Sequence, residues 1–271
     1  VKDGIADWSI GEAIGIGSIL RDNIHIRFTG EDVERGTMAH SPKLLAIWEA
    51  QYGDFADTAQ PVFDTFIANG ESKWVQQSGV VVQLPHGIDG AGPEHSSARV
   101  ERFLAASDDD EDLIPNLDDK MMELANVTTP ANYFHLIRRQ VAMPFRKPLI
   151  LMTPKIGLKH PYYRSPFKDF LPGTSFQRAI RESGPASKKP ECVKKLIFCV
   201  GKVALTIDEL RKEKKIEDKI ALCRIEQIYP FPYDIVLQEF CLYENAKVCF
   251  CQEEHKNQGP WIYCKMYLKT R

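Results

Sequence analysis

The sequence predicts an α/β fold with two domains, each built on a mostly parallel sheet with helices on both faces. Short apolar segments of strand length alternate along the 271-residue chain with longer segments of helical spacing, which is typical of parallel βαβ units. Residues 80–84 are apolar or neutral and lie between Gly79 and Pro85, as expected of a strand buried on both faces. A segment rich in proline and glycine, at about residues 159–190, separates two such alternating regions.

The elements of the first region each have a local signal. Trp8, Ile14 and Ile19 share one face at helical spacing. Thr128 or Thr129 can provide a capping hydroxyl, and Pro130 a first-turn proline, for a later helix. The prediction for this region is a helix at 7–20, strands at 24–28 and 44–48, a long helix at 56–77, a strand at 80–84, a helix at 98–106, a strand at 125–127, the helix that starts at 128–130, and a strand at 149–152.

The second region repeats the alternation. We expect strands at 196–200, 220–226 and 247–251, with helices at 204–214 and 232–242 between them. Residues 159–190 are expected to form a linker or a connection over the surface. We therefore place a domain boundary near residue 158, which gives domains of residues 1–157 and 158–271.

Composition excludes some classes of protein. The net charge of −2 at pH 7 argues against a nucleic-acid binder, which normally has a basic excess. No window approaches the ~18 consecutive apolar residues of a membrane span, so we expect none. The sequence opens on Val1 rather than Met and shows no leader or transit segment, so we expect the start of a longer protein to be missing.

All seven cysteines lie in the last third of the chain. The close pair is Cys249 and Cys251, separated by one residue, whereas zinc sites favour pairs separated by two. The cysteines are therefore interpreted as reduced thiols in buried strands of an intracellular protein, and no metal ligands are expected in this chain.

One connection is unusually short. Residues 29–43, between the strands expected at 24–28 and 44–48, carry no apolar helical face. A parallel crossover normally contains a helix. Either these two strands are not joined by the usual crossover, or a segment is absent here.

Three polar loops follow predicted strands, where ligands collect in open parallel sheets. Residues 85–99 combine three glycines with His86 and His95, and histidine exchanges protons near neutral pH. Residues 48–55 carry aromatic side chains that could stack a flat heterocycle or belong to the core. Residues 251–261 are rich in charge, for which solvation is the simplest interpretation.

Together with other segments, these loops resemble the E1 subunits of 2-oxoglutarate dehydrogenase complexes, which depend on thiamine diphosphate. The resemblance runs in order over nearly the whole chain. It is carried by residues 30–37 (GEDVERGT), 48–55 (WEAQYGDF), 85–103, 146–150 (RKPLI), 153–155 (TPK), 224–227 (RIEQ), 230–232 (PFP) and 252–259 (QEEHKNQG). The sibling 2-oxoadipate E1 is also similar, at residues 41–45 and 90–93, whereas residues 255–259 favour the 2-oxoglutarate enzyme.

The resemblance implies a transketolase-like architecture, with a pyrimidine-binding domain at 1–157 and an E1 C-terminal domain at 158–271. It implies decarboxylation of 2-oxoglutarate by thiamine diphosphate and transfer of the succinyl group to a lipoyl group on the E2 subunit, in the tricarboxylic acid cycle. Phe55 would stack on the aminopyrimidine ring, with Gln51 and Tyr52 as further cofactor-binding residues.

The resemblance also implies catalytic residues. His95 matches the histidine that serves the substrate or the incoming lipoyl group, and Ser96 lies beside it. His86 and Arg99 are expected to support this loop. The implied partners are a second E1 subunit in a homodimer, the E2 dihydrolipoyl succinyltransferase and E3, and the implied location is the mitochondrial matrix.

Two departures from the family pattern argue that this chain alone is inactive. The diphosphate-binding domain, which would supply the Mg²⁺ site, is expected upstream, and residues 86–90 (HGIDG) do not replace it because they belong to the other domain. Roughly fifty further residues, a length consistent with a helical crossover, are expected between His40 and Ser41. They include the glutamate that would hydrogen-bond the pyrimidine ring.

Two alternatives stay open at this point. The chain could be a non-catalytic module that assembles with a full E1 or with E2, which the absent metal motif and glutamate favour. Some other transketolase-like chemistry would need a replacement acid near the pyrimidine pocket, and Glu49 and Asp54 are the candidates for it.

Overall fold

In the computed structural model, residues 4–29, 44–89, 92–109, 122–155 and 160–268 are described. The expected shortening at residues 40 and 41 and the expected boundary at 157 and 158 lie outside these ranges. Two sheets form the framework, one of six strands and one of four, and both are mostly parallel. The α/β fold expected from the sequence is therefore confirmed. No helix in the described part of the chain is long and apolar enough to cross a bilayer.

The six-stranded sheet is parallel except at one end. Its strands, in spatial order, are β11 (Gln227–Tyr229), β5 (Glu123–Asn126), β6 (Leu149–Pro154), β4 (Val81–His86), β3 (Leu44–Glu49) and β2 (His25–Thr29). Only β11, which is antiparallel to β5, breaks the pattern. The parallel strands place their carboxyl ends along one edge, where the loops after β3, β4 and β6 meet.

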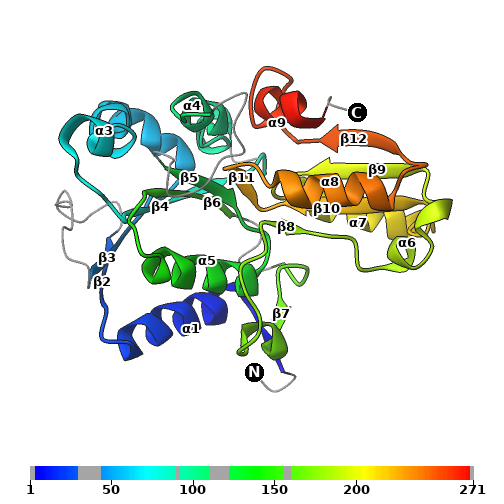
Figure 1. Ribbon diagram of the computed structural model, residues 1–271, viewed down its shortest axis with the longest axis horizontal. Coiled ribbons are helices and arrows are strands. Elements are labelled where there is room, and N and C mark those ends of the chain that lie inside the picture. Colours follow the sequence, from blue (N-terminus) through cyan, green and yellow to red (C-terminus); the bar gives the residue numbers. More distant parts are fainter. Residues whose placement is uncertain (1–3, 30–43, 90–91, 110–121, 156–159, 269–271) are drawn as a thin grey trace.

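Helices cover both faces of this sheet (Figure 1). Helices α1 (Trp8–Arg21) and α5 (Pro130–Ala142) pack on one face against the alternating side chains Leu45 and Ile47. The opposite face, with Trp48 and Val82, packs against α4 (Val100–Ala105) and the segment before it. Helix α5 begins as predicted, because the Thr129 side chain accepts a hydrogen bond from the Asn132 amide and Pro130 occupies the first turn.

The long helix predicted at 56–77 was wrong as a single element. The chain instead forms the 3-10 helix η1 (Gly53–Ala59), a short α2 (Gln60–Val62), a π-helical turn η2 (Phe63–Ile67) and α3 (Gly70–Trp74). Pro61 lacks an amide donor, and Asn69 and Gly70 are weak helix formers. These residues divide the segment, and of its apolar side chains Phe63 is buried whereas Phe66 and Trp74 are exposed.

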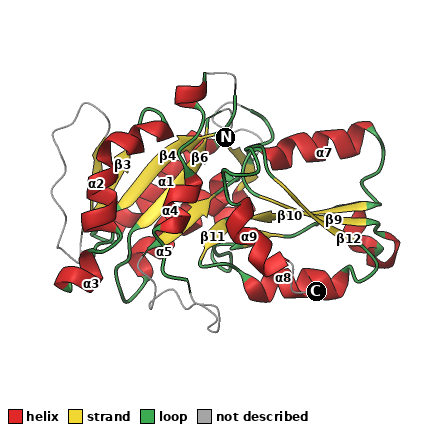
Figure 2. Ribbon diagram, turned by 90° about the horizontal axis from the view of Figure 1, so that it is seen from above, coloured by secondary structure: helices red, strands yellow, loops and turns green. Residues whose placement is uncertain are grey.

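The four-stranded sheet has the order β12 (Lys247–Cys251), β9 (Lys195–Cys199), β10 (Ile220–Ile225) and β8 (Ala179–Ile180), and only β8 is antiparallel. Helix α7 (Val203–Glu213) covers one face, and α8 (Tyr233–Leu242) and α9 (Trp261–Leu268) lie on the other (Figure 2). The connection before β9 contains β7 (Ser165–Pro166), which pairs with β1 (Ile5–Ala6), then η6 (Phe167–Phe170), β8, α6 (Pro185–Lys188) and η7 (Pro190–Cys192).

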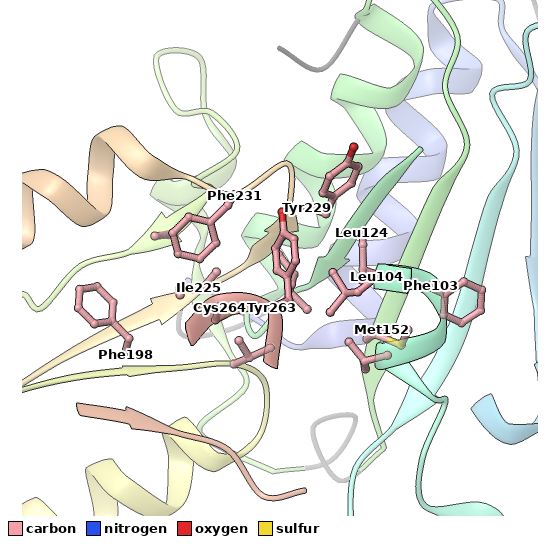
Figure 3. Close-up of a cluster of buried hydrophobic side chains, with 14 of the residues drawn as sticks. Phe103, Leu104, Leu124, Met152, Phe198, Ile225, Tyr229, Phe231, Tyr263 and Cys264 are labelled. Atoms are coloured by element: carbon pink, nitrogen blue, oxygen red, sulfur yellow. The ribbon is translucent and has the colours of Figure 1, made fainter. Parts of the chain in front are cut away.

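One apolar core joins the two sheets. Strand β11 follows β10 in the chain but leaves the second sheet and pairs with β5 of the first. Figure 3 shows the result, in which the fully buried Tyr229 lies between Leu124 of the first sheet and Phe231 beside the second. Because buried side chains of both sheets pack together, the two α/β units share their main core.

Candidate functional site

Loops from both sheets meet at the carboxyl ends of their strands. In the first sheet these are the loop after β3 (residues 50–56), the described residues after β4 (87–89 and 92–99) and Lys155 after β6; in the second they are the loops after β9 and β12. Ion pairs and hydrogen bonds connect them across the junction. The two loops singled out in the first region and the charged loop of the second therefore form one polar group, the junction site.

His86, the last residue of β4, is buried and uses both ring nitrogens. Its Nδ1 accepts a hydrogen bond of 3.0 Å from the Ala98 amide, and its Nε2 lies 2.7 Å from Glu254 Oε1. Burial raises the pKa of Glu254, but the hydrogen bond and charge of His86 outweigh it and the net pKa is lowered. His86 thus joins the loop that it begins to Glu254, and both of its ring nitrogens are engaged within the fold.

A second ion-pair group holds the tip of the same loop. Lys202 Nζ lies 2.5 Å from Asp89 Oδ1, 2.9 Å from Glu253 Oε2 and 2.7 Å from the Ile88 carbonyl oxygen. Burial lowers the pKa of Lys202, but the hydrogen bonds that its ammonium group donates to the carboxylates of Asp89 and Glu253 raise it by more. The ammonium group is therefore bound by the loop of one sheet and the loop of the other.

His95 is the half-buried centre of an aromatic group. The Tyr52 ring stacks on the imidazole at 4.3 Å with an interplanar angle of 19°, and the Phe55 ring lies 6.3 Å away. Its Nδ1 is 3.8 Å from Asp54 Oδ1. Lys155, after β6, donates a hydrogen bond of 2.6 Å to the His95 carbonyl oxygen. The structure therefore brings the predicted residues His95, Tyr52 and Phe55 together.

Gly53 allows the two first-region loops to touch. A Cβ atom at this position would lie 2.4 Å from the Ala98 Cβ and 2.5 Å from the Pro85 carbonyl oxygen, distances that real side chains do not show. Any other residue would push the loop after β3 away from the loop after β4. Only glycine keeps Tyr52 and Phe55 beside His95.

The remaining predicted site residues differ in placement. The Ser96 hydroxyl donates to the Gly92 carbonyl oxygen, and the Ser96 carbonyl accepts from the Gly87 amide at 2.9 Å. Ser96 thus closes the loop after β4, which carries His95 and is called the histidine loop below. Gln51 is exposed. Arg99 pairs with Asp57 at 3.2 Å and supports the loop as expected.

Two acids of the junction site lie in a loop that the sequence marked but that was interpreted as solvated, and one lysine was not singled out. Solvation was the interpretation for residues 251–261, and it was wrong for Glu253 and Glu254, whose side chains are only 15% and 7% exposed. Lys202 gave no signal either, because nothing local marks the partner of an interdomain ion pair. The dense charge that follows β12 was the one available clue.

Glu49, a candidate replacement acid, lies on the other face of the first sheet. Its pKa is raised by burial and further by the charge of Glu12 on α1, whereas Phe55 packs on the face of Trp48. It therefore does not serve the aromatic group around His95. Asp54 does lie there.

The described residues contain no group of three or more His, Cys, Asp or Glu side chains arranged to hold a metal ion. The seven cysteines form no disulfide. Burial raises the pKa of the Cys199 thiol to about 12 and that of Cys223 well above its usual range. These two lie in buried strands, but the expectation was wrong for Cys192 and Cys241, which are exposed, and for Cys264, which lies in a helix.

Comparison with known protein families finds two adjacent matches. Residues 34–160 match the transketolase pyrimidine-binding domain, and residues 164–271 match the 2-oxoglutarate dehydrogenase C-terminal domain. The first match contains the loops with Phe55 and His95, and the second contains Lys202 and Glu254. The junction site thus combines residues of both domains.

Similar proteins include the mitochondrial 2-oxoglutarate dehydrogenase of Caenorhabditis elegans, 42% identical over 332 residues that cover 100% of this chain and 32% of that protein. The mitochondrial 2-oxoglutarate dehydrogenase-like protein of Rattus norvegicus is 42% identical over 99% of the chain and 32% of its own length. The Dictyostelium discoideum enzyme is 37% identical over 97% and 32%. The chain spans about a third of these relatives.

Proposed function

Because this chain belongs to the family of 2-oxoglutarate dehydrogenases, we propose that it is the part of an E1 subunit that binds the pyrimidine ring of thiamine diphosphate and provides the acid–base histidine. The observation that carries the proposal is the contact of Tyr52 and Phe55 with His95 at the carboxyl edge of the first sheet. Aromatic side chains beside a proton-exchanging imidazole suit a flat heterocycle and a reacting carbonyl.

The residues present fit the pyrimidine half of the cofactor. Phe55 is half-buried, packs against the main core and would stack on the aminopyrimidine ring, with Tyr52 and Gln51 around it. When bound, thiamine diphosphate supplies the nucleophilic carbon and the electron sink for decarboxylation. The described residues offer no set of ligands for the Mg²⁺ that would bind the diphosphate, so we assign that role to a separate domain.

The histidine loop provides the residues of this chain that exchange protons during the reaction. His95 is the group that exchanges protons with the substrate or with the lipoyl group that accepts the succinyl product. Ser96 and His86 hold the loop in shape through the Gly92 carbonyl and Glu254. Lys155 fixes the His95 backbone and excludes other conformations of this residue.

For the whole protein we propose oxidative decarboxylation of 2-oxoglutarate with transfer of the succinyl group to E2. Two E1 subunits, E2 and E3 would be the partners and the mitochondrial matrix the location. The relatives are mitochondrial 2-oxoglutarate dehydrogenases or 2-oxoglutarate dehydrogenase-like proteins, which supports this substrate over 2-oxoadipate.

We further propose that this chain alone does not catalyse the reaction. The aligned C. elegans relative extends over 332 residues where this chain has 271, so at least 61 of its residues have no counterpart here. Strands β2 and β3 pair in parallel although only residues 30–43 connect them, which supports the loss of a crossover at this point.

The test compares the purified chain with a chimera. The chain should neither decarboxylate 2-oxoglutarate nor bind thiamine diphosphate with Mg²⁺ in calorimetry. Restoring the upstream and internal segments from the C. elegans relative should give activity. His95→Ala should abolish that activity, whereas His160→Ala, at a half-exposed histidine weakly paired with Glu209, should keep it.

Decarboxylation by the chain alone, or a chimera that keeps full activity after His95→Ala, would refute the proposal. A non-catalytic assembly module is the second candidate, favoured by the short connection between β2 and β3. It requires the isolated chain to bind a full E1 or E2 in sedimentation experiments while it fails to bind cofactor.

A further inference from the structure

We propose that Asp54 is a positioning residue that fixes His95 in its Nδ1–H tautomer and makes Nε2 the nitrogen that exchanges protons. The inference rests on the proposed function in one respect, because it assigns the acid–base atom of the histidine named there. Its evidence and its test involve neither cofactor nor substrate. The observation is a pair of facing side-chain atoms, Asp54 Oδ1 and His95 Nδ1, neither of which has a hydrogen-bond partner among the residues that the structure describes.

Two orphaned atoms face each other in this pair. Asp54 Oδ1 and His95 Nδ1 are both buried side-chain atoms without a hydrogen-bond partner, and they lie 3.8 Å apart. A buried polar atom left unpaired costs about 1–3 kcal/mol, whereas a hydrogen bond to a carboxylate is among the stronger ones in proteins. A movement of roughly 1 Å would bring the two atoms to hydrogen-bond distance and pair both.

The surroundings fix the direction of the ring. Tyr52 stacks on one face of the imidazole, and Lys155 holds the backbone of the same residue through its carbonyl oxygen. Nδ1 therefore points inward to Asp54. Nε2 points toward Glu94, 3.9 Å away, whose side chain is 67% exposed. The outward nitrogen is the one that a substrate can reach.

His86 in the same loop has the opposite assignment. Its Nδ1 accepts a hydrogen bond from the Ala98 amide and so carries no proton in the neutral ring. Its proton is on Nε2, which donates to Glu254. The two histidines therefore have opposite tautomers. Both nitrogens of His86 are hydrogen-bonded within the fold, whereas Nε2 of His95 carries a lone pair that can accept a proton.

Asp54 also joins two parts of the site. It is adjacent to Phe55, the residue proposed to stack on the pyrimidine ring, and Gly53 before it brings this turn against the histidine loop. A carboxylate in this turn can orient the imidazole only while both loops are in place. In other proteins a carboxylate beside a catalytic or metal-binding histidine fixes the tautomer of that histidine in the same way. The tautomer of His95 therefore indicates whether the two loops have come together.

The test is ¹⁵N NMR of the full chain with ¹⁵N-labelled histidine, at about pH 8.5 so that the rings are neutral. Long-range proton–nitrogen correlations show which nitrogen of each ring carries the proton. His95→Gln and His86→Gln assign the signals. We expect Nδ1–H for His95 and Nε2–H for His86 in the unaltered chain. In Asp54→Ala the His95 pattern should change toward Nε2–H while His86 keeps its own.

Asp64→Ala is the matched control, because Asp64 lies in the nearby turn η2 and accepts a hydrogen bond from Gln60 instead. It should leave His95 in the Nδ1–H form. The unchanged His86 signal shows in each variant that the loop is folded. A His95 ring with Nε2–H in the unaltered chain, or one that Asp54→Ala does not alter, overturns the inference. The proposed enzymatic role would survive that result, since no cofactor enters the experiment.

Discussion

At the scale of single residues, the surroundings of some carboxylates in this molecule lower the pKa and those of others raise it. Glu254 has a lowered pKa because the pairing with His86 outweighs its burial. Glu49 has a raised pKa because it is buried and faces Glu12, whose own pKa is raised mainly by burial. The first carboxylate stabilises the fold as an anion and the second does so only when protonated.

Glu49→Gln should therefore raise the melting temperature at neutral pH. A raised pKa means that stability is present below the unfolded pKa of about 4.3 and is lost as the pH rises through the folded value. The gain, about 2 °C or somewhat more, should appear at pH 7 and vanish near pH 4. Thermal denaturation across that range measures it. Glu254→Gln should instead lose stability at pH 7, and a loss from both variants would contradict the assignment.

A second residue-scale prediction concerns Val75, a β-branched residue with φ 56° that ends α3 and is 87% exposed. A left-handed conformation costs an ordinary residue roughly 1–2 kcal/mol, more than the entropy that glycine adds to the unfolded chain. Val75→Gly should stabilise the protein by about 1 kcal/mol in urea denaturation. Val62→Gly, at an exposed valine with helical angles, should destabilise it slightly.

At the scale of elements, the loop after β4 is shaped by the domain that follows it in the chain. Glu254 and Lys202 bind His86 and Asp89 from the second sheet, so the histidine loop is not a local structure of the first. The loop owes its conformation to the contact between the sheets.

Glu254→Ala should loosen that loop selectively. The amides of Gly87 and Ala98 are protected by Ser96 and His86, and their hydrogen exchange should accelerate by about tenfold or more, because a hydrogen bond to a charged group contributes about 1.5–3 kcal/mol. Glu209→Ala, at a side chain that is 61% exposed on α7, is the control and should leave both amides unchanged. Unchanged exchange of both amides in Glu254→Ala would show that the loop is stable by itself.

The same scale shows what the sequence could predict. Strands at 44–48, 80–84, 149–152 and 247–251 and the helix capped by Thr129 were recoverable, because burial periodicity and capping are local. The division of 56–77 required knowing that Pro61 and Gly70 outweigh an apolar pattern. Strand β11 was not predicted, since the expected strand ended at residue 226 and the partner of β11, β5, lies about a hundred positions earlier.

The candidate site likewise contains residues that the sequence could indicate and residues that it could not. The resemblance named His95, Tyr52 and Phe55, and the structure brings them together. Asp54 was noticed only as a possible acid, and Lys202 not at all. Their significance comes from distances between loops, which no spacing along the chain encodes.

At the scale of the whole molecule, the shared core makes the two α/β units one folding unit. We expect a single calorimetric transition rather than two. Tyr229→Ala, at the junction of the sheets, should cost about 3–5 kcal/mol and accelerate hydrogen exchange in β5 and β9 together. Leu136 lies in the separate core between α1, α5 and the first sheet. Leu136→Ala should therefore accelerate hydrogen exchange in β5 much more than in β9. Two resolved transitions in the unaltered chain would contradict this prediction.

Strand β2 has a consequence for the chain inside a cell. It is the last strand in the order of the six-stranded sheet and bonds on one side to β3, so among the described strands its other side has no partner. Such an edge, here with Phe28 40% exposed, is a template on which another copy can add a strand. Aggregation through this edge therefore competes with correct folding. The fraction of newly made chains that stays unaggregated should depend on their concentration and on chaperones that cover the edge.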